Sequence, residues 1–407
     1  MFPRLRFKKF DGDWTAVTLE SLAEVERGKF SVRPRNDPRY FGGEMPFIQT
    51  GDVTGSDVYL KGYTQTLNDD GIRVSKVFPA DTILITIAAN IGDTTITQYS
   101  VACPDSVVAI QPKQDKVNTI FLKNVIDLQK DNLDSQATQN AQKNINLQVL
   151  KPLKLIVPLK GEQTQIASFL SAVDEKISQL TQKHQLLSQY KQGMMQKLFS
   201  QQIRFKADDG GEFAKWEDSK LGELTTLITK GTTPSSLGEK YEESGINFIK
   251  IESLSSNGKF LLDKFAYIDE NTHNKLARSK LEHDDILFSI AGALGRVAII
   301  SRDYLPANTN QALAIIRLKD KKITRYIYYF LNSDYVKKII DAESVQLAQA
   351  NFSLGQLANL DVLVPCLEEQ TKIANFLSAI DQKIEVVAQQ IEQAKTWKKG
   401  LLQQMFI

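Results

Sequence analysis

The residue types that most often carry out chemistry are scarce and scattered in this chain. Three histidines (His184, His273 and His283) and two cysteines (Cys103 and Cys366) are too few and too dispersed for a zinc site or a disulfide framework. No GxxxxGK[ST] loop and no GxGxxG fingerprint follows a strand-like segment. The Asn/Asp-Pro-Pro-aromatic run of amino-methyltransferases is also missing. These patterns therefore identify no catalytic residue and no metal site.

One pattern imitates a metal-dependent nuclease. Pro104-Asp105 is followed by Gln111-Pro112-Lys113, which resembles the PD…(D/E/Q)xK arrangement, although the intervening span is short. A second copy of this region carries Asn310, Ile316 and Leu318 at the aligned positions, and these could not bind a metal. A free-standing nuclease remains a third function class, with Asp105 as its only candidate.

Basic residues gather in two windows. The first comprises Arg27, Lys29, Arg33, Arg35 and Arg39, next to Tyr40 and Phe41, and the second comprises Arg317, Lys319, Lys321, Lys322 and Arg325. Loop arginines beside aromatic residues suit contacts to phosphates and base edges, although a solvated basic loop would have the same composition. The segment KGTTPSSLGEKY from Lys230 corresponds to the first window and carries hydroxyl groups instead of charge. The candidate DNA-binding residues are Arg27, Lys29, Arg33, Arg35, Arg39, Tyr40, Gln49, Lys61, Lys230, Thr232, Thr233, Lys240, Lys250, Arg278, Lys280 and Arg296.

Composition bounds the class of protein. The 407 residues are 42% hydrophobic and 24% charged, which is ordinary for a globular protein and argues against extended disorder. The net charge is +2, and residues 1–150 carry 17 − 18 = −1, so any DNA-binding charge must be local. No apolar run is long enough for a membrane helix, and the N-terminus has no apolar signal-peptide region. We expect a cytoplasmic protein.

The chain repeats itself. Residues 162–200 and 369–407 are identical at 17 of 39 positions with a shift of 207. The similarity extends upstream, where NINLQVLKPLKLIVP matches NFSLGQLANLDVLVP, and DTILITIAANIG resembles DDILFSIAGALG at a shift of 203. The chain therefore consists of two divergent globular units, each followed by a closely similar helix.

Each of these helices carries a narrow apolar seam with heptad spacing. The predicted seam residues are Leu170, Val173, Ile177, Leu180, Leu187 and Met194 in the first helix, and Leu377, Ile380, Ile384, Val387, Ile391 and Leu401 in the second. Such a seam indicates a coiled coil between the two copies, although two ordinary core helices would also fit. The spacing leaves both a parallel and an antiparallel pair open. About 37 helical residues would give a rod of roughly 55 Å.

The expected fold class is mixed α/β, or α+β, with a pseudo-two-fold internal repeat. Buried strands are predicted at Ile83–Ile87 and Ile286–Ile290, and helices at Phe121–Gln129 and Tyr326–Ile340. The predicted boundaries are a first globular domain at 1–158, a long helix at 159–200, a linker at 201–213, a second globular domain at 214–365 and a second long helix at 366–407.

The doubled segment PLKGEQTQIASFLSAVDEKI from Pro158 and PCLEEQTKIANFLSAIDQKI from Pro365 resembles the specificity subunit of type I restriction-modification systems. The resemblance covers essentially the whole chain. It implies two target recognition domains that each read half of a bipartite, asymmetric DNA site, and an antiparallel coiled coil that sets the distance between the halves. It also implies two methyltransferase subunits, optional restriction subunits, and S-adenosylmethionine, ATP and Mg on those partners. The chain itself would then be no enzyme and would hold no cofactor. A coiled-coil scaffold that contacts only proteins is the alternative function.

Overall fold

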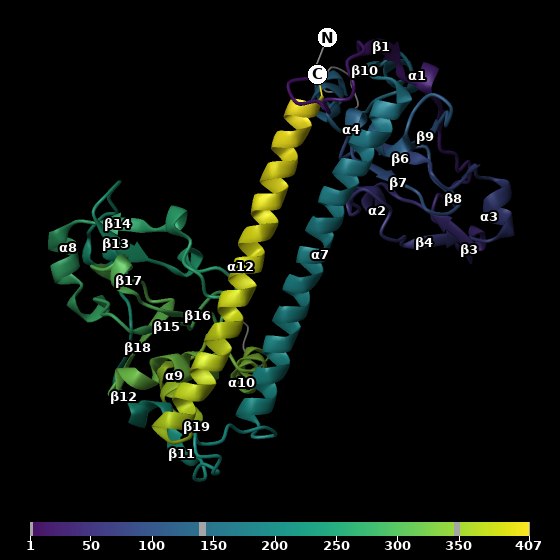
Figure 1. Cartoon of the computed structure of the whole chain (residues 1–407). Helices are drawn as coiled ribbons and strands as arrows, with labels where there is room; N and C mark the ends of the chain where they lie inside the picture. Colours follow the sequence, from purple (N-terminus) through teal and green to yellow (C-terminus); the bar gives the residue numbers. More distant parts are fainter. Residues whose placement is uncertain (1–2, 138–143, 346–350, 407) are drawn as a thin grey trace. The chain divides into compact units, whose positions relative to one another are not determined.

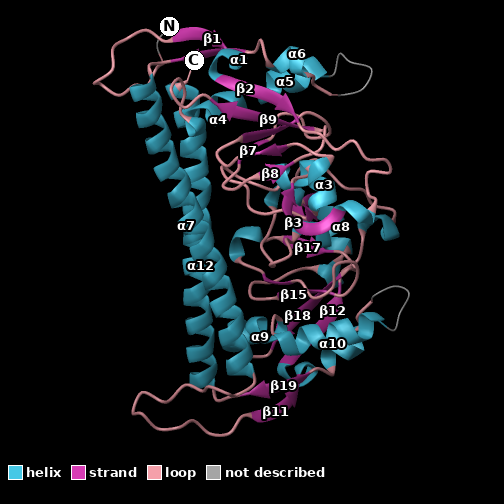
Figure 2. Ribbon diagram, turned by 90° about the vertical axis from the view of Figure 1, so that its right-hand side faces the viewer, coloured by secondary structure: helices cyan, strands magenta, loops and turns pink. Residues whose placement is uncertain are grey.

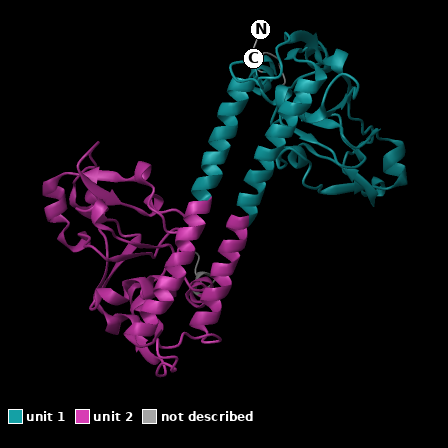
Figure 3. Cartoon of the chain, in the orientation of Figure 1, with its two compact units in different colours: residues 1–182, 388–407 teal, residues 183–387 magenta. Residues whose placement is uncertain are grey.

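The computed structural model describes residues 3–137, 144–345 and 351–406, which form two compact units. Unit 1 contains residues 1–182 and 388–407, and unit 2 contains residues 183–387 (Figure 3). Each unit therefore combines one globular domain with parts of both long helices. None of the helices in the described part of the chain has the length and apolar character that a membrane span requires.

The elements of unit 1 follow one another as β1 (Thr15–Thr18), α1 (Leu19–Leu22), β2 (Ala23–Arg27), β3 (Phe41–Phe47), α2 (Thr50–Thr54), β4 (Gln65–Leu67), α3 (Asp69–Arg73), β5 (Val77–Phe78), β6 (Ile83–Thr86), β7 (Thr94–Ile96), β8 (Val101–Ala102), β9 (Val107–Pro112), α4 (Thr119–Asp127), α5 (Lys130–Ala137), α6 (Leu147–Leu150), β10 (Lys154–Val157) and the start of α7 (Lys160–Phe199). They form sheets with strand orders β2-β9-β6-β7, β4-β3-β8-β5 and β1-β10. Figure 1 labels most of these elements.

The elements of unit 2 are β11 (Glu217–Lys220), β12 (Thr225–Lys230), β13 (Ile246–Ile249), β14 (Ala266–Ile268), α8 (Glu270–Lys275), β15 (Ile286–Ser289), β16 (Val297–Ile299), β17 (Ala307–Thr309), β18 (Leu313–Leu318), α9 (Thr324–Leu331), α10 (Asp334–Val345), α11 (Leu354–Ala358), β19 (Asp361–Val364) and α12 (Leu367–Met405). Their sheets have strand orders β12-β18-β15-β16, β14-β13-β17 and β11-β19. Strand for strand, this is the topology of unit 1 without β5, so the internal repeat is also a structural repeat. The segment predicted as one helix at Tyr326–Ile340 is two helices, which Asn332 and Ser333 separate.

The main core of each unit joins one sheet to the helices, the β2-β9-β6-β7 sheet in unit 1 and the β12-β18-β15-β16 sheet in unit 2. In unit 1, Phe121 on α4 packs against Phe406 and Trp14, with ring centroids 5.4 and 6.2 Å apart. In unit 2, Tyr326 on α9 packs against Phe199 and Trp216, at 5.7 and 6.4 Å. The two aromatic triads occupy equivalent positions of the repeat, and each one anchors the end of a long helix to a globular domain.

Within each unit, α7 and α12 run antiparallel. In unit 1, the backbone N–H of Leu5 donates to Gln404 near the end of α12, while the neighbouring Arg6 pairs with Glu162 near the start of α7. In unit 2, Arg204 follows the end of α7 and pairs with Glu369 near the start of α12. Each short connecting segment thus ties the end of one helix to the start of the other. Figure 2 distinguishes the helices, in cyan, from the strands, in magenta.

The predicted seam residues are buried or half-buried in the structure. Leu170, Val173 and Leu180 are buried on α7, as are Leu377, Ile380, Val387, Ile391 and Leu401 on α12, while Ile177, Leu187, Met194 and Ile384 are half-buried. Near the end of α7, the neighbouring Met195 is buried more deeply than Met194. The core of unit 1 continues along the helix pair, because it includes Leu170 and Val173 together with Leu401.

Candidate nucleic-acid interface

A close crossing of two backbone segments organises the same edge of both domains. In unit 1, the loop after β2 crosses the segment between β8 and β9 at Gly28, where a Cβ atom would lie 2.3 Å from the carbonyl oxygen of Pro104. In unit 2, the loop after β12 makes the same crossing at Gly231, where a Cβ atom would lie 2.0 Å from the carbonyl oxygen of Thr309. Only glycine permits such an approach. The two loops that differ most between the repeats are therefore held in equivalent places.

Parallel strands bring two further candidates to this edge. β3 pairs parallel with β8, and β13 pairs parallel with β17, so the carboxyl ends of each pair lie side by side. Gln49 follows β3 by two residues, and Lys250 directly follows β13. Both therefore lie near the crossing segment of their own unit.

The basic loop of unit 1 is exposed, and several of its side chains are held by acceptors. Arg27 Nε donates to the carbonyl oxygen of Asp105 at 2.5 Å, and Arg35 pairs with the Asp105 carboxylate at 2.8 Å. Arg39 pairs with Asp37 at 2.6 Å, and this hydrogen bond lowers the pKa of the Asp37 carboxyl group. Charged guanidinium groups therefore stand at the surface in partly fixed orientations, which suits contact with phosphates or guanine edges.

The remaining candidates in this loop have less support. Arg33 Nη1 donates to the backbone carbonyl oxygens of Val32, at 2.8 Å, and Phe30, at 3.5 Å, and not to a carboxylate of any described residue. Lys29 is exposed and forms no ion pair with any other described residue. Its charge is therefore available for a partner outside the chain.

Aromatic residues stiffen the base of this loop. Phe30 lies edge-on to Tyr40, with centroids 6.3 Å apart, and packs against Phe47 at 5.0 Å. Phe30 and Phe47 are buried, while Tyr40 is half-buried and lies under the guanidinium group of Arg39 at 5.8 Å. The loop is thus anchored at both ends to a small apolar core.

Unit 2 presents hydroxyl and amide groups at the equivalent place. Arg278 Nη2 donates to Thr232 Oγ1 at 2.9 Å, and the Thr233 hydroxyl donates to the side chain of Gln311. Lys280 Nζ donates to Asn274 Oδ1 at 2.7 Å. This network joins the loop after β12, the segment around α8, and the turn before β18.

Three lysines complete the surface of unit 2. Lys250 lies over the ring of Tyr241 at 5.5 Å and pairs with Glu252 at 2.8 Å, which lowers the pKa of the Glu252 carboxyl group. Lys230 and Lys240 are exposed, and neither forms an ion pair within the described part of the chain. Unit 2 therefore offers fewer arginines and more hydroxyl groups than unit 1 on an equivalent framework.

Two candidates lie elsewhere. Lys61 pairs with Asp57 at 2.8 Å in a loop beside β7. Arg296, at the turn between β15 and β16, is half-buried and donates to the carbonyl oxygens of Ile251 and Leu254. Its contacts are those of a structural residue that holds two loops together.

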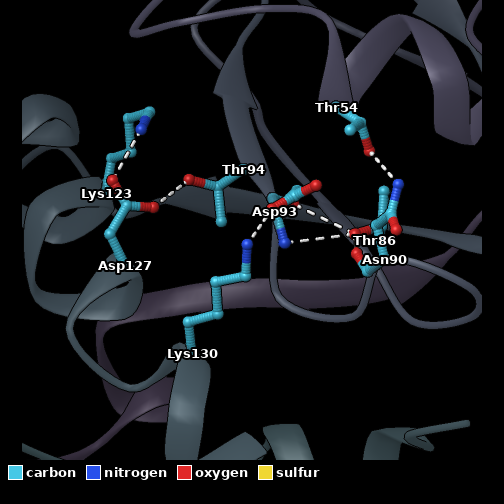
Figure 4. A network of polar contacts seen from close by, with 8 residues as sticks. All are labelled: Thr54, Thr86, Asn90, Asp93, Thr94, Lys123, Asp127 and Lys130. Carbon is cyan, nitrogen blue, oxygen red and sulfur yellow. Dashed lines mark hydrogen bonds and ion pairs between the residues drawn. The ribbon is translucent and has the colours of Figure 1, made fainter. Parts of the chain in front are cut away.

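The equivalent turn of unit 1 carries an acid in place of Arg296. Figure 4 shows this turn, in which Asp93 pairs with Lys130 and its backbone N–H donates to Thr86 Oγ1 at 3.1 Å. Nearby, Lys123 pairs with Asp127 at 2.7 Å. In both units the side chain at this position therefore fastens the turn between two strands to a neighbouring segment. The side chain is an acid in unit 1 and a base in unit 2.

The structure separates the groups of the nuclease-like pattern. Asp105 precedes β9 and pairs with Arg35, while Gln111 and Lys113 lie at the far end of that strand. Six strand residues at about 3.3 Å each place them about 20 Å apart. No group of three or more His, Cys, Asp or Glu residues in the described part of the chain is placed to hold a metal ion.

The second basic window, which belongs to unit 2, also lies away from the candidate interface, because it begins with Arg317 at the far end of β18. Arg317 pairs with Asp285 at 2.7 Å and with Glu282 at 2.5 Å, and Lys321 Nζ donates to the carbonyl oxygen of His283. These basic side chains hold local structure together.

The sequence analysis did not identify the hydrogen-bond acceptors that orient the candidate DNA-binding side chains. Asp37, Asp105 and Gln311 each hold a candidate side chain. Asp105 and Gln311 are 70 and 78 residues distant from Arg35 and Thr233. Only their position in the segment before β9 or β18, which the alignment of the two copies exposes, could have indicated them.

Comparison with known proteins identifies the family. The type I restriction modification DNA specificity domain matches residues 11–189 and 214–396. The chain is 25% identical to the type I restriction enzyme MjaVIII specificity subunit of Methanocaldococcus jannaschii over 97% of this chain and 94% of that protein. It is 22% identical to the EcoBI specificity subunit of Escherichia coli, over 96% and 84% of the two chains.

Solved structures share the fold. The crystal structure of the type I restriction-modification S subunit from M. genitalium is similar with a TM-score of 0.62 at 18% identity, over 100% of this chain and 99% of that one. A chain from a structural study of complex assembly and conformational transition of the type I R-M system gives a TM-score of 0.57 at 15% identity, with 97% and 98% covered. With two copies of the matching domain spanning most of its length, this chain belongs to the family of type I restriction-modification specificity subunits.

Proposed function

We propose that the two domains read the two halves of a bipartite, asymmetric DNA site. The observation that carries this proposal is the contrast between the two candidate surfaces. Equivalent backbone crossings at Gly28 and Gly231 present arginines in unit 1 and threonines, amides and lysines in unit 2. Because different base edges require different donors and acceptors, unlike side chains on like frameworks suit unlike half-sites.

In this proposal the chain itself performs no chemistry. Two adenine methyltransferase subunits bind it and use S-adenosylmethionine, and restriction subunits that use ATP and Mg can join them. The paired helices hold the two domains at a fixed separation, so that the half-sites are recognised at one spacing.

Methylome sequencing of cells that contain the chain and its methyltransferase partner tests the proposal. Arg35→Gln in unit 1 should relax or change one half of the methylated motif and leave the other half intact. Thr233→Val in unit 2 should affect only the opposite half. Lys154→Gln, an exposed change on β10 in unit 1, is the matched control and should leave both halves unchanged. A change in both halves after either single substitution would contradict the proposal.

The alternative, a scaffold that contacts only proteins, makes a different prediction in solution. A DNA-reading complex loses affinity steeply with salt, because lysine and arginine contacts release counterions from phosphates. If Lys29 contacts one phosphate, Lys29→Gln should reduce the slope of log K against log salt by about 0.9. Binding that is independent of salt and of sequence in the complete complex would favour the scaffold.

A further inference from the structure

Two ion pairs join α7 to α12, and they are the same contact made twice. In unit 2, Lys191 Nζ lies 2.6 Å from Asp381 Oδ1. In unit 1, Lys398 Nζ lies 2.5 Å from Asp174 Oδ1. The repeat shift of 207 converts Asp174 to Asp381 and Lys191 to Lys398. The four side chains are only 21–36% exposed, so both pairs are partly shielded by the helices.

We infer that these two pairs are positioning contacts that select the antiparallel orientation and the register of α7 and α12. The consequence for DNA, a fixed distance between half-sites, rests on the proposed function.

The charges disfavour a parallel arrangement. If two such similar helices paired in parallel with equivalent residues opposite, Lys191 would face Lys398 and Asp174 would face Asp381. Like charges in a partly shielded seam repel each other and lose the solvation that they have in the unfolded chain. In the antiparallel arrangement each lysine meets an aspartate.

The charges also disfavour a shifted register. Sliding one helix by a heptad would place Lys191 opposite Ala374 or Ala388, and Lys398 opposite Ala167 or Thr181. No acid would then stand opposite either lysine. Apolar seam residues discriminate weakly between registers, because their attraction is non-directional. A polar group in the seam discriminates more strongly, because every register that leaves it without a partner is less stable.

The pair in unit 2 is better supported than its copy. Tyr329 donates its hydroxyl to Asp381 Oδ2 at 2.8 Å, and its ring lies 5.3 Å from Lys191 Nζ. In unit 1, Asp174 Oδ2 is buried and accepts no hydrogen bond from any described residue. Substitutions at the unit 2 pair should therefore have the larger effect.

Charge reversal in the full-length chain tests the inference. The variants are Lys191→Asp, Asp381→Lys and the double variant, with Lys197→Asp as an exposed control on α7. Spin labels at Gln192 and Lys383, two exposed positions of unit 2 on different helices, report their relative displacement after Cys366→Ser. A slide of one heptad moves a label by about 10 Å.

Each single reversal should broaden or shift the distance distribution and lower the melting temperature, and the double variant should restore both. If both single variants match the Lys197→Asp control in distance and in melting, the inference is wrong.

A second readout separates the inference from the proposed function. In the complex with methyltransferase, a selection over DNA sites with variable gaps should show one spacing for the wild type and the double variant, and a weakened or broadened preference for the single variants. If the label distances respond as expected and the spacing does not, the ion pairs set the register, and the helices are not the ruler of the proposed function.

Discussion

Glu369 is completely buried at the start of α12, and it accepts three hydrogen bonds. Arg204 donates to it through Nε at 3.0 Å and Nη2 at 2.6 Å, and Trp216 Nε1 donates at 2.9 Å. The next residue, Gln370, donates to the carbonyl oxygen of Pro365 at 2.7 Å. The Glu-Gln pair of the repeated segment thus fastens a connecting segment and the preceding turn to the helix, and in unit 1 Glu162 and Gln163 do the same with Arg6 and Pro158.

Removing the Glu369 carboxylate should therefore be costly. Glu369→Ala leaves Arg204 and Trp216 without their acceptor, and breaking a buried ion pair in this way costs about 3 kcal/mol or more. The adjacent Glu368→Ala removes only a solvent-screened ion pair with Lys372 and should change the free energy of unfolding little. Urea unfolding measures the free energy of unfolding of both variants. Equal, small effects would contradict the role of Glu369.

At the scale of elements, the sequence predicts those strands and helices that the internal repeat and the hydrophobic periodicity mark. The strands predicted at Ile83–Ile87 and Ile286–Ile290 are β6 and β15, and the two helices with heptad spacing are α7 and α12. The connecting segments were missed, although LRFK at Leu5 and IRFK at Ile203 are nearly identical. Their shift of 198 differs from the shift of 202 that relates Trp14 to Trp216, because the linker of unit 2 is four residues longer. The match therefore did not align with the rest.

The candidate site was predicted less well than the fold, for a physical reason. Composition indicates that a loop is basic, but the sheets decide which loops meet. Arg27 and Arg35 share Asp105 because Gly28 lets the loop cross the segment before β9. Arg296 has the same charge, yet it donates to two carbonyl groups inside its own unit. Charge alone could not separate these cases.

A glycine near the C-terminal end of each long helix allows a prediction at this scale. A Cβ atom at Gly193 or Gly400 would meet nothing within 4 Å, and α7 and α12 continue past both positions. Because glycine costs about 0.5–1 kcal/mol relative to alanine in a helix, Gly193→Ala and Gly400→Ala should each stabilise the chain by about that amount.

Thermal unfolding measures this gain, and a lower melting temperature would contradict it. If a partner backbone approaches the helices at these glycines, the same variants should also bind methyltransferase more weakly, although they are more stable.

At the scale of the whole molecule, the repeat gives each compact unit one copy of the same surface feature. Tyr190 on α7 belongs to unit 2 and Trp397 on α12 belongs to unit 1, and the shift of 207 relates the two. Their side chains are 51% and 54% exposed, so they are available to a partner. Aromatic residues are frequent anchors of protein interfaces, so the two positions suit one methyltransferase subunit each, as the proposed function requires.

Native mass spectrometry of the complex with methyltransferase checks this arrangement. Tyr190→Ala and Trp397→Ala should each shift the population from two bound subunits towards one, while changes at the neighbouring exposed positions, Gln189→Ala and Thr396→Ala, should not. Trp397 also packs edge-on against Phe169 at 6.0 Å, so its variant needs a melting curve to show that unit 1 is still folded.

Losing one anchor of about 2 kcal/mol weakens binding at that surface about 30-fold. Because the two anchors lie in different compact units, their effects should be additive, and the double variant should bind neither subunit tightly. Two subunits bound to the folded double variant at unchanged affinity would exclude these aromatic residues from the interface.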